Sequence, residues 1–375
     1  MYHFSRGLVI REKFVYNKTV LKITVQLDAP GRDKPMHTIN MLSRAESVKG
    51  QGVLSAYEEQ VRLVKEELAD EFVCYINRPG LCDIMHYHTI NPEFFALRQM
   101  SRGKSVSVGY VHFLPETVDN SLSLPPHIRK IFYRYMIRFY KSMDHLVTVN
   151  PYFIGELEKY GVPRERVTYI PNFVSKERFY PLAPEEKAAL RRKYGLPEDR
   201  FLVFCAGQLQ KRKGFFDYIE LALRMPDVRF VWAGSFAFGL ISEGHDEIKR
   251  ILEHPPENFT LLGLIDRDRM NEVYNLADLM LLPSFEELFP MTVLEAMNTH
   301  TPILLRDLDI YPDILFDFYL KAADVDGFEA EIRRLQTDRT YAAAAAARSA
   351  KGADFYSRDH VAAMWREFYN GILSK

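Results

Sequence analysis

The stretch P-S-F-E-E-L-F-P-M-T-V-L-E-A-M, residues 283–297, decides the fold because it joins a strand, a loop and a helix. The run L-M-L-L at residues 279–282, directly before it, is typical of a strand buried on both faces. Proline suits the first helical position, so a helix is expected from near Pro290 through Met297. Such units are typical of open α/β sheets, which bind ligands at the carboxyl ends of their strands.

Two carboxylates flank this junction, with Glu287 in the loop and Glu295 on the helix. At the helix start, the backbone amides of Met291 and Thr292 would face the crevice and suit an anion such as diphosphate. The alternative is that Glu287 is a solvated loop residue and Glu295 a helix-surface residue.

The pattern S-x-x-E-x-F-P-x-x-x-L-E-A-M resembles the signature of glycosyltransferase family 4, retaining enzymes of the GT-B fold that use nucleotide sugars. The resemblance implies that Glu287 touches the transferred sugar and that Glu295 bonds the nucleotide ribose. It also implies that the intervening segment approaches the donor, through Phe289, Pro290, Met291 and Thr292.

A second motif, F-L-V-F-C-A-G-Q-L-Q-K-R-K-G at residues 201–214, predicts a buried strand, a polar loop and a helix from near Phe215. It resembles the family loop G-R-L-x-x-x-K-G, whose basic side chains bind the donor diphosphate. Gly207 and Lys213 match that loop, whereas Gln208 replaces its arginine and supplies no charged fork. Lys211 or Arg212 is an open alternative for the missing charge, and a solvated cationic turn is the alternative for the whole K-R-K run.

Composition bounds the class of protein. The chain has 375 residues, a formal net charge of -1 and 47% hydrophobic residues, which predicts a globular protein of two domains and argues against nucleic-acid binding. Cys74, Cys82 and Cys205 are odd in number and widely spaced, which favours a reducing compartment over disulfides or a thiolate zinc site. With no apolar run of membrane length and a poor signal-peptide pattern, a cytoplasmic protein is expected.

The resemblance implies an α/β protein of GT-B type, with two Rossmann-like domains facing each other across a cleft. Strands alternate with helices along the chain, as such a fold requires. We expect strands at residues 37–42, 84–88, 105–111, 145–149, 202–206, 229–233, 260–262, 279–282 and 303–305, and a linking loop at 167–174. The predicted segments are an N-terminal extension of uncertain structure (1–35), an acceptor domain (36–174), a nucleotide-sugar domain (175–355) and a helix that packs back on the first domain (356–375).

Two further features fall on the acceptor side. The resemblance implies a cleft loop at Lys49, Gly50, Gln51 and Gly52, although a lone G-x-G is as often a flexible turn. His112 directly follows an apolar strand, where the family often has a functional histidine near the sugar; a hydrogen-bonded structural histidine is the alternative. His86 and His88 end another strand and are expected to line the cleft, since no third metal ligand is nearby in sequence.

No cofactor and no metal are expected besides the nucleotide-sugar co-substrate. Metal independence is implied by the resemblance, because cationic side chains and helix N-termini can carry the developing charge. D-x-D triplets occur at residues 266–268, 307–309 and 324–326, and chance accounts for such triplets in a chain rich in acidic residues. Lys213 is the cation that the resemblance places at the leaving group.

The segment P-H-I-R-K-I-F-Y-R-Y-M-I-R-F-Y-K-S-M, residues 126–143, predicts an amphipathic helix without acidic residues. One stripe of that helix is cationic and consists of His127, Lys130, Arg134, Arg138 and Lys141. This stripe is either an ordinary basic outer face or an attachment to anionic lipid at the inner face of the cell membrane.

The fragments I-N-M-L-S-R-A-E-S-V-K-G-Q-G-V, Y-V-H-F-L-P-E-T and G-Q-L-Q-K-R-K-G look like bacterial diglycosyl-diacylglycerol synthases, which add a second hexose to monoglucosyl-diacylglycerol. The resemblance thus implies a retaining hexosyltransferase that moves glucose or galactose from a UDP-sugar to a membrane glycolipid. The alternatives are a transferase for a soluble or cell-envelope saccharide and a catalytically silent scaffold that binds lipid.

Overall fold

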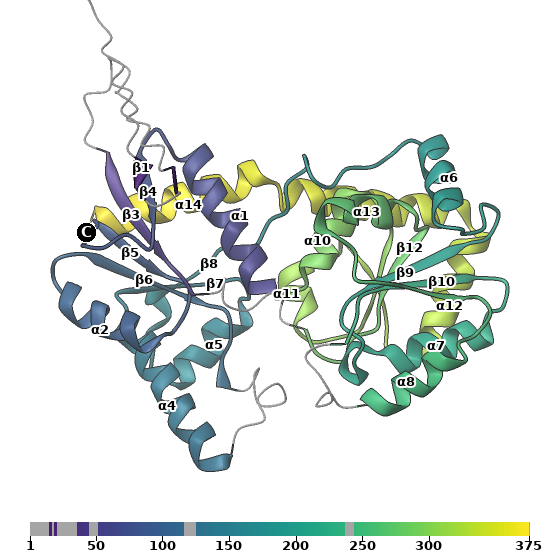
Figure 1. Ribbon diagram of the computed structural model, residues 1–375, viewed down its shortest axis with the longest axis horizontal. Helices are drawn as coiled ribbons and strands as arrows, with labels where there is room; N and C mark the ends of the chain where they lie inside the picture. Colours follow the sequence, from purple (N-terminus) through teal and green to yellow (C-terminus); the bar gives the residue numbers. More distant parts are fainter. Residues whose placement is uncertain are drawn as a thin grey trace, which may run out of the picture. The chain divides into compact units, whose positions relative to one another are not determined.

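The computed structural model describes residues 36–44, 52–115, 125–236, 244–287 and 289–374, with backbone alone for 52–55 and 126, and two short strands nearer the N-terminus. Those strands, β1 (Val15–Tyr16) and β2 (Thr19–Val20), pair antiparallel within a compact unit, Met1–Pro35. The second unit, Met36–Lys375, contains two six-stranded parallel sheets (Figure 1).

The N-terminal sheet has the strand order β4-β3-β5-β6-β7-β8, and every pairing in it is parallel. Its strands are β3 (His37–Leu42), β4 (Phe72–Ile76), β5 (Ile84–Tyr87), β6 (Val106–Val111), β7 (His145–Thr148) and β8 (Val167–Tyr169). The helices between them are α1 (Gly52–Glu67), α2 (Pro92–Ser101), α4 (Pro126–Ser142) and α5 (Tyr152–Lys159). Parallel strands need such crossover helices, which cover both faces of the sheet.

The C-terminal sheet has the order β11-β10-β9-β12-β13-β14 and is also parallel throughout. Its strands are β9 (Leu202–Ala206), β10 (Arg229–Ala233), β11 (Phe259–Gly263), β12 (Leu279–Leu282), β13 (Ile303–Arg306) and β14 (Leu320–Ala322). The strand order changes direction between β9 and β12: β10 and β11 lie on one side of β9, and β12 to β14 lie on the other. Open α/β sheets bind ligands at such a switch point.

Helices cover the second sheet because its central strands are apolar at every position, so that both faces must be buried. They are α6 (Pro184–Lys193), α7 (Phe215–Arg224), α8 (His245–Glu253), α9 (Met270–Asn275), α10 (Met291–Asn298), α11 (Tyr311–Leu315), α12 (Val325–Thr337) and α13 (Arg339–Phe355).

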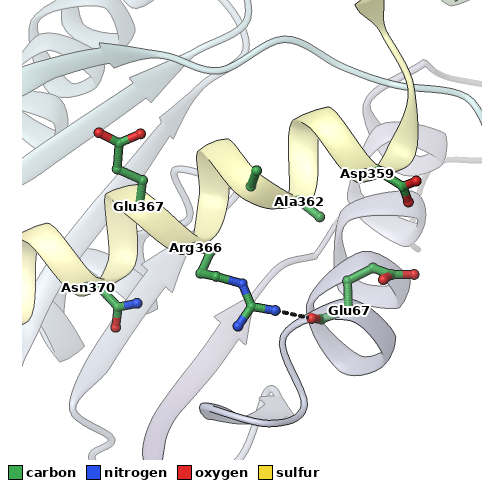
Figure 2. A pocket seen from close by; sticks show the side chains of 7 residues that line it. Glu67, Asp359, Ala362, Arg366, Glu367 and Asn370 are labelled. Carbon is green, nitrogen blue, oxygen red and sulfur yellow. Dashed lines mark hydrogen bonds between the residues drawn. The ribbon is translucent and has the colours of Figure 1, made fainter. Parts of the chain in front are cut away.

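The last helix, α14 (Arg358–Leu373), packs beside α1 and the N-terminal sheet (Figure 1). Trp365 on α14 is buried, and its ring centroid lies 6.0 Å from that of Tyr110 on β6. Figure 2 shows Arg366 donating to the backbone carbonyl of Glu67, in a pocket that α1 and α14 line. The end of the chain therefore completes the hydrophobic layer of the first sheet.

The nine predicted strands are confirmed in type, with ends that differ by at most one residue. In the two six-stranded sheets, three strands escaped prediction: β4, and the three-residue β8 and β14. Residues 167–174, expected as a linking loop, open with β8. For residues 167–169 that expectation was wrong, because β8 has only three residues, too few for a periodic pattern, and its pairing with β7 forms it. Residues 170–174 lie outside helices and strands, as expected.

Candidate active site

The motif at residues 201–214 folds as a strand and a tight turn that leads into a helix. Strand β9 is buried along its whole length, and the 3-10 turn Lys211–Lys213 follows it. Gly214 then adopts a left-handed φ of 74°, which ends the turn and begins α7. A Cβ at this position would run into the carbonyl of Pro283, so glycine is required for the close approach of the two chains.

The motif at residues 283–297 follows β12. Helix α10 begins at Met291, with Pro290 as its N-cap. The expected start near Pro290 is therefore confirmed to within one residue, although proline occupies the cap and not the first helical position. The amides of Met291 and Thr292 are among the orphan donors at the helix start, so an anion in the loop would meet the positive end of the helix.

The fold brings the two motifs into direct contact. The Lys213 Nζ atom lies 2.5 Å from Oε1 of Glu287, and the exposed fractions of these side chains are only 16% and 8%. The backbone amide of Phe285 also donates to the carbonyl of Arg212, at 2.8 Å. A cation and a carboxylate from separate motifs thus form one buried ion pair at the carboxyl edge of the sheet.

Glu295 lies at a different point of the site. It is buried on α10, where the Tyr274 hydroxyl donates to its Oε2 at 2.6 Å and Arg267 Nη1 lies 3.6 Å from its Oε1. Burial raises the pKa of Glu295, although Arg267 and the Tyr274 hydrogen bond act in the opposite direction. The expectation of a helix-surface residue is excluded, and the interactions described for Glu295 link it to neither Lys213 nor Glu287.

Gly207 and Gln208 of the motif at residues 201–214 lie between β9 and the turn. The Gly207 amide donates to the carbonyl of Ala233, and its own carbonyl accepts from Trp232 Nε1 at 2.9 Å. Gln208 is half-buried after the strand, whereas Lys211 is exposed. The Gly207 segment is therefore fixed by backbone contacts with β10.

Phe289 lies in the loop before α10. Its side chain is buried, and its ring centroid lies 5.7 Å from that of Tyr356, edge to face. Phe289 therefore packs into the core, and a donor molecule could meet this residue only through its backbone.

The N-terminal domain contains three histidines at the ends of β5 and β6, of which His86 and His88 are buried and His112 is half-buried. His86 and His88, expected to line the cleft, are instead 0% and 2% exposed, because α1 and α14 cover this face. His112 stacks on Tyr110 with ring centroids 4.3 Å apart. Burial lowers the pKa of His86 and of His112 to about 3 and that of His88 well below its ordinary value. All three imidazoles are therefore neutral at physiological pH.

The predicted cleft loop falls almost wholly outside the described residues: Lys49, Gly50 and Gln51 lie there, and Gly52 is the first residue of α1. The strand end that leads into this loop is held by Asn77. Its side-chain amide donates to the carbonyl of Ser43 at 3.0 Å, and its oxygen accepts from the Ser43 amide at 3.1 Å.

Helix α4 carries the cationic stripe as predicted. Lys130, Arg134, Arg138 and Lys141 are all exposed. Two apolar side chains are exposed beside them, Ile128 (43%) and Ile131 (66%). The helix thus presents cations and isoleucines together to solvent, whereas its C-terminal half is anchored by buried Met136 and Phe139.

The described residues also bear on metal binding and membrane insertion. Among these residues, no group of three or more histidine, cysteine, aspartate and glutamate side chains is placed to hold a metal ion. No described helix is both long and apolar enough to span a bilayer.

Sequence reasoning missed three side chains that contact the motifs: Tyr274 and Arg267 around Glu295, and Arg306 beneath the Glu287 loop. The only signal for Arg306 was a charged residue closing an apolar strand, I-L-L-R. Tyr274 and Arg267 gave no signal, because their contacts arise from tertiary packing between separate elements.

Two parallel Rossmann-like sheets, with a Lys–Glu pair and a helix N-terminus at the carboxyl edge of the second, define a GT-B glycosyltransferase. Comparisons with known proteins agree. Residues 75–178 match the family model described as Glycosyltransferase Family 4, and residues 186–352 match that of Glycosyl transferases group 1.

Curated relatives include the alpha-galactosylglucosyldiacylglycerol synthase of Streptococcus pneumoniae, which is 43% identical over 90% of this chain and 90% of its own. The processive diacylglycerol alpha-glucosyltransferase of Acholeplasma laidlawii is 31% identical over 50% of this chain and 56% of its own. The chain belongs to the GT-B glycosyltransferases of family 4 and is close in sequence to the diglycosyl-diacylglycerol synthases.

Solved structures share the fold at low sequence identity. Anabaena HepE in complex with UDP and glucose superposes with a TM-score of 0.69 at 15% identity, covering 89% of this chain and 100% of that one. Sucrose-phosphate synthase from Thermosynechococcus elongatus superposes with a TM-score of 0.72 at 15% identity, covering 90% and 99%. These likenesses show the GT-B architecture alone.

Proposed function

We propose that this glycosyltransferase transfers glucose or galactose, with retention, from a UDP-sugar to a membrane glycolipid such as monoglucosyl-diacylglycerol. The observation that carries the proposal is the 43% identity, over 90% of both chains, to a synthase of a diglycosyl-diacylglycerol. The buried pair of Lys213 and Glu287 beside the start of α10 supplies matching chemistry for a nucleotide-sugar donor.

In the proposed donor site, Lys213 and the amides of Met291 and Thr292 carry the negative charge of the leaving diphosphate. Glu287 accepts hydrogen bonds from the hydroxyls of the transferred sugar and holds Lys213 in place. Glu295, oriented by the Tyr274 hydroxyl, accepts from the ribose. These cationic and dipolar groups stabilise the leaving group, so the proposal includes neither a metal nor a cofactor.

The segments Gly207–Gln208 and Phe289–Pro290 are proposed to line the donor through their backbones. His112 is proposed to face the transferred sugar from the first domain. A neutral imidazole suits this role, because it can exchange hydrogen bonds with a hydroxyl without presenting a charge.

For the acceptor side, we propose that α4 attaches the protein peripherally to the inner face of the cell membrane. Exposed cations on a helix that contains no acidic residue attract anionic headgroups, and Ile128 and Ile131 add apolar area that can enter the interface. A lipid-embedded acceptor would then meet the domain that carries His112.

The donor is tested by thermal shift with UDP-, GDP- and ADP-sugars, followed by turnover with two kinds of acceptor. The proposal expects stabilisation by a UDP-sugar and turnover that detergent-dispersed monoglucosyl-diacylglycerol stimulates. If a soluble saccharide stimulates turnover and the glycolipid does not, the acceptor is a saccharide and the lipid acceptor is excluded.

The membrane surface is tested by flotation with anionic vesicles at low and high salt. Changing Lys130, Arg134, Arg138 and Lys141 together to Gln should release the protein, since each cation near the surface contributes about 1 kcal/mol. The matched control changes four exposed cations of the C-terminal half to Gln: Lys249, Arg250, Arg339 and Lys351. Equal flotation of both variants would indicate that α4 is an ordinary basic outer face and does not attach the protein to the membrane.

A further inference from the structure

Arg306 is a buried arginine at the end of β13, next to the strand that leads into the Glu287 loop. It is 7% exposed, although a guanidinium is costly to bury unless its donors are satisfied. Arg306 lies beneath the candidate site and outside both motifs, and its contacts show which segments it holds together.

The guanidinium joins three segments of the second domain. Its Nε donates to the carbonyl of Pro283 at 2.9 Å, Nη1 donates to the carbonyl of Ala323 at 2.8 Å, and Nη2 is paired with the Asp217 carboxylate. The Cζ atom also lies 3.9 Å from the ring centroid of Phe285. Only a planar fork with several donors can make these contacts at once, which lysine cannot do.

Three of these partners belong to the segments that carry the proposed donor residues. Pro283 and Phe285 begin the loop that leads to Glu287. Asp217 lies in the first turn of α7, four residues after Lys213. The two segments also touch directly, because the carbonyl of Pro283 is the atom that leaves no room for a Cβ at Gly214.

We propose that Arg306 is a positioning residue for the donor site: it fixes the Lys213 turn and the Glu287 loop in one geometry. The inference rests on the proposed donor function of that pair. Arg306 itself lies behind the loop and touches neither Lys213 nor Glu287 in any contact described. Its effect on transfer would therefore arise from geometry, to which transfer rates are sensitive at the scale of about 1 Å.

The test compares Arg306→Lys with Arg191→Lys. Arg191 is a matched control, because it is also a buried arginine of this domain that donates to backbone carbonyls, of Leu276 and Arg200, and pairs with Asp278. Each variant is measured for thermal midpoint, for kcat and donor KM, and for amide hydrogen exchange of the segments 211–217 and 283–289.

We expect Arg306→Lys to lower kcat about 10- to 100-fold and to speed exchange in both segments. Arg191→Lys should lose thermal stability while its kcat stays within about twofold of wild type. Unchanged kcat and exchange in Arg306→Lys, or an equal loss of kcat in Arg191→Lys, would overturn the inference.

Asp217→Asn provides a second variant that keeps the arginine and removes one partner, in case Arg306→Lys does not fold. It should lower kcat by a smaller factor and speed exchange in segment 211–217; wild-type values for both would count against the inference. The exchange measurement needs no substrate. Failure of wild-type enzyme to use any nucleotide sugar would therefore defeat the proposed function separately from the role of Arg306.

Discussion

At the scale of single residues, the site depends on an ion pair that is almost closed to water. Removing one partner of a buried ion pair is destabilising, because the charge of the other partner stays buried without compensation. In the proposed donor site, Lys213 and Glu287 hold each other in place for a ligand with one negative and one hydroxyl-bearing end. A sugar diphosphate has both.

Replacing Glu287 by Ala should lower kcat about 100-fold, because the sugar loses its proposed partner and Lys213 loses its anchor. Affinity for UDP, which lacks the sugar, should change much less. Steady-state kinetics and titration calorimetry with UDP measure the two effects, with Glu287→Gln as the isosteric control. Wild-type turnover in Glu287→Ala, or UDP affinity that falls as far as kcat, would contradict the assignment.

Replacing Glu295 by Ala should weaken UDP binding by roughly 1.5–3 kcal/mol, the contribution of a hydrogen bond to a charged group. Tyr274→Phe should weaken binding less, since it keeps the carboxylate and removes only its orienting donor. Calorimetry with UDP distinguishes the variants. Full affinity in Glu295→Ala would exclude a ribose contact.

The contact of Lys213 with Glu287 follows from motifs that the sequence displays, because each motif sits at the end of a recognisable strand. The partners of Glu295 do not follow from the sequence, since Tyr274 and Arg267 come from segments with no motif of their own. For the charge that Gln208 does not supply, the sequence left Lys211 and Arg212 open as alternatives. The structure leaves Lys211 exposed and Arg212 half-buried.

At the scale of elements, fully buried apolar strands such as β9 and β12 were predictable because burial on both faces leaves a continuous signal, whereas β4, which is only partly buried, was missed. Short edge strands were not: β8 and β14 have three residues each and form through pairing with a neighbour. The amphipathic pattern of α4 was also visible in sequence, whereas the exposure of two of its isoleucines was not.

Those isoleucines give an element-scale prediction. Changing Ile128 and Ile131 together to Ser should reduce binding to neutral and anionic vesicles alike, because the apolar term does not depend on lipid charge. The thermal midpoint should stay near wild type, since both side chains are largely exposed. Leu223→Ser on α7, also an exposed apolar residue, is the control. Vesicle binding equal to wild type would limit α4 to an electrostatic contact.

At the scale of the whole molecule, the neutral histidines couple stability to pH. The pKa of His86 and of His112 is lowered from 6.5 to about 3 by burial, and the pKa of His88 is lowered as well. Below pH 6.5 these histidines therefore bind protons in the unfolded chain while they stay neutral in the native protein. The free energy of unfolding falls as pH falls. Glu295, whose pKa is raised, acts in the opposite direction but is a single group.

We therefore expect the thermal midpoint to drop between about pH 7 and about pH 5, with at most about 1.4 kcal/mol per pH unit for each histidine. His88→Gln should make the dependence shallower by removing one titrating group. Differential scanning calorimetry across this range measures it. A flat profile, or the same slope in His88→Gln, would mean that these histidines accept protons in the native state.

The proposed retention determines the configuration of the glycosidic bond that the enzyme forms. The most direct measurement is therefore the anomeric configuration of the product. The wild-type enzyme is incubated with an α-configured UDP-glucose or UDP-galactose and monoglucosyl-diacylglycerol, and the lipid product is analysed by proton NMR. We expect a diglycosyl lipid in which the new sugar is α-linked, because a retaining enzyme keeps the configuration of the donor. A β-linked product, or no lipid product under conditions where a soluble saccharide is glycosylated, would contradict it.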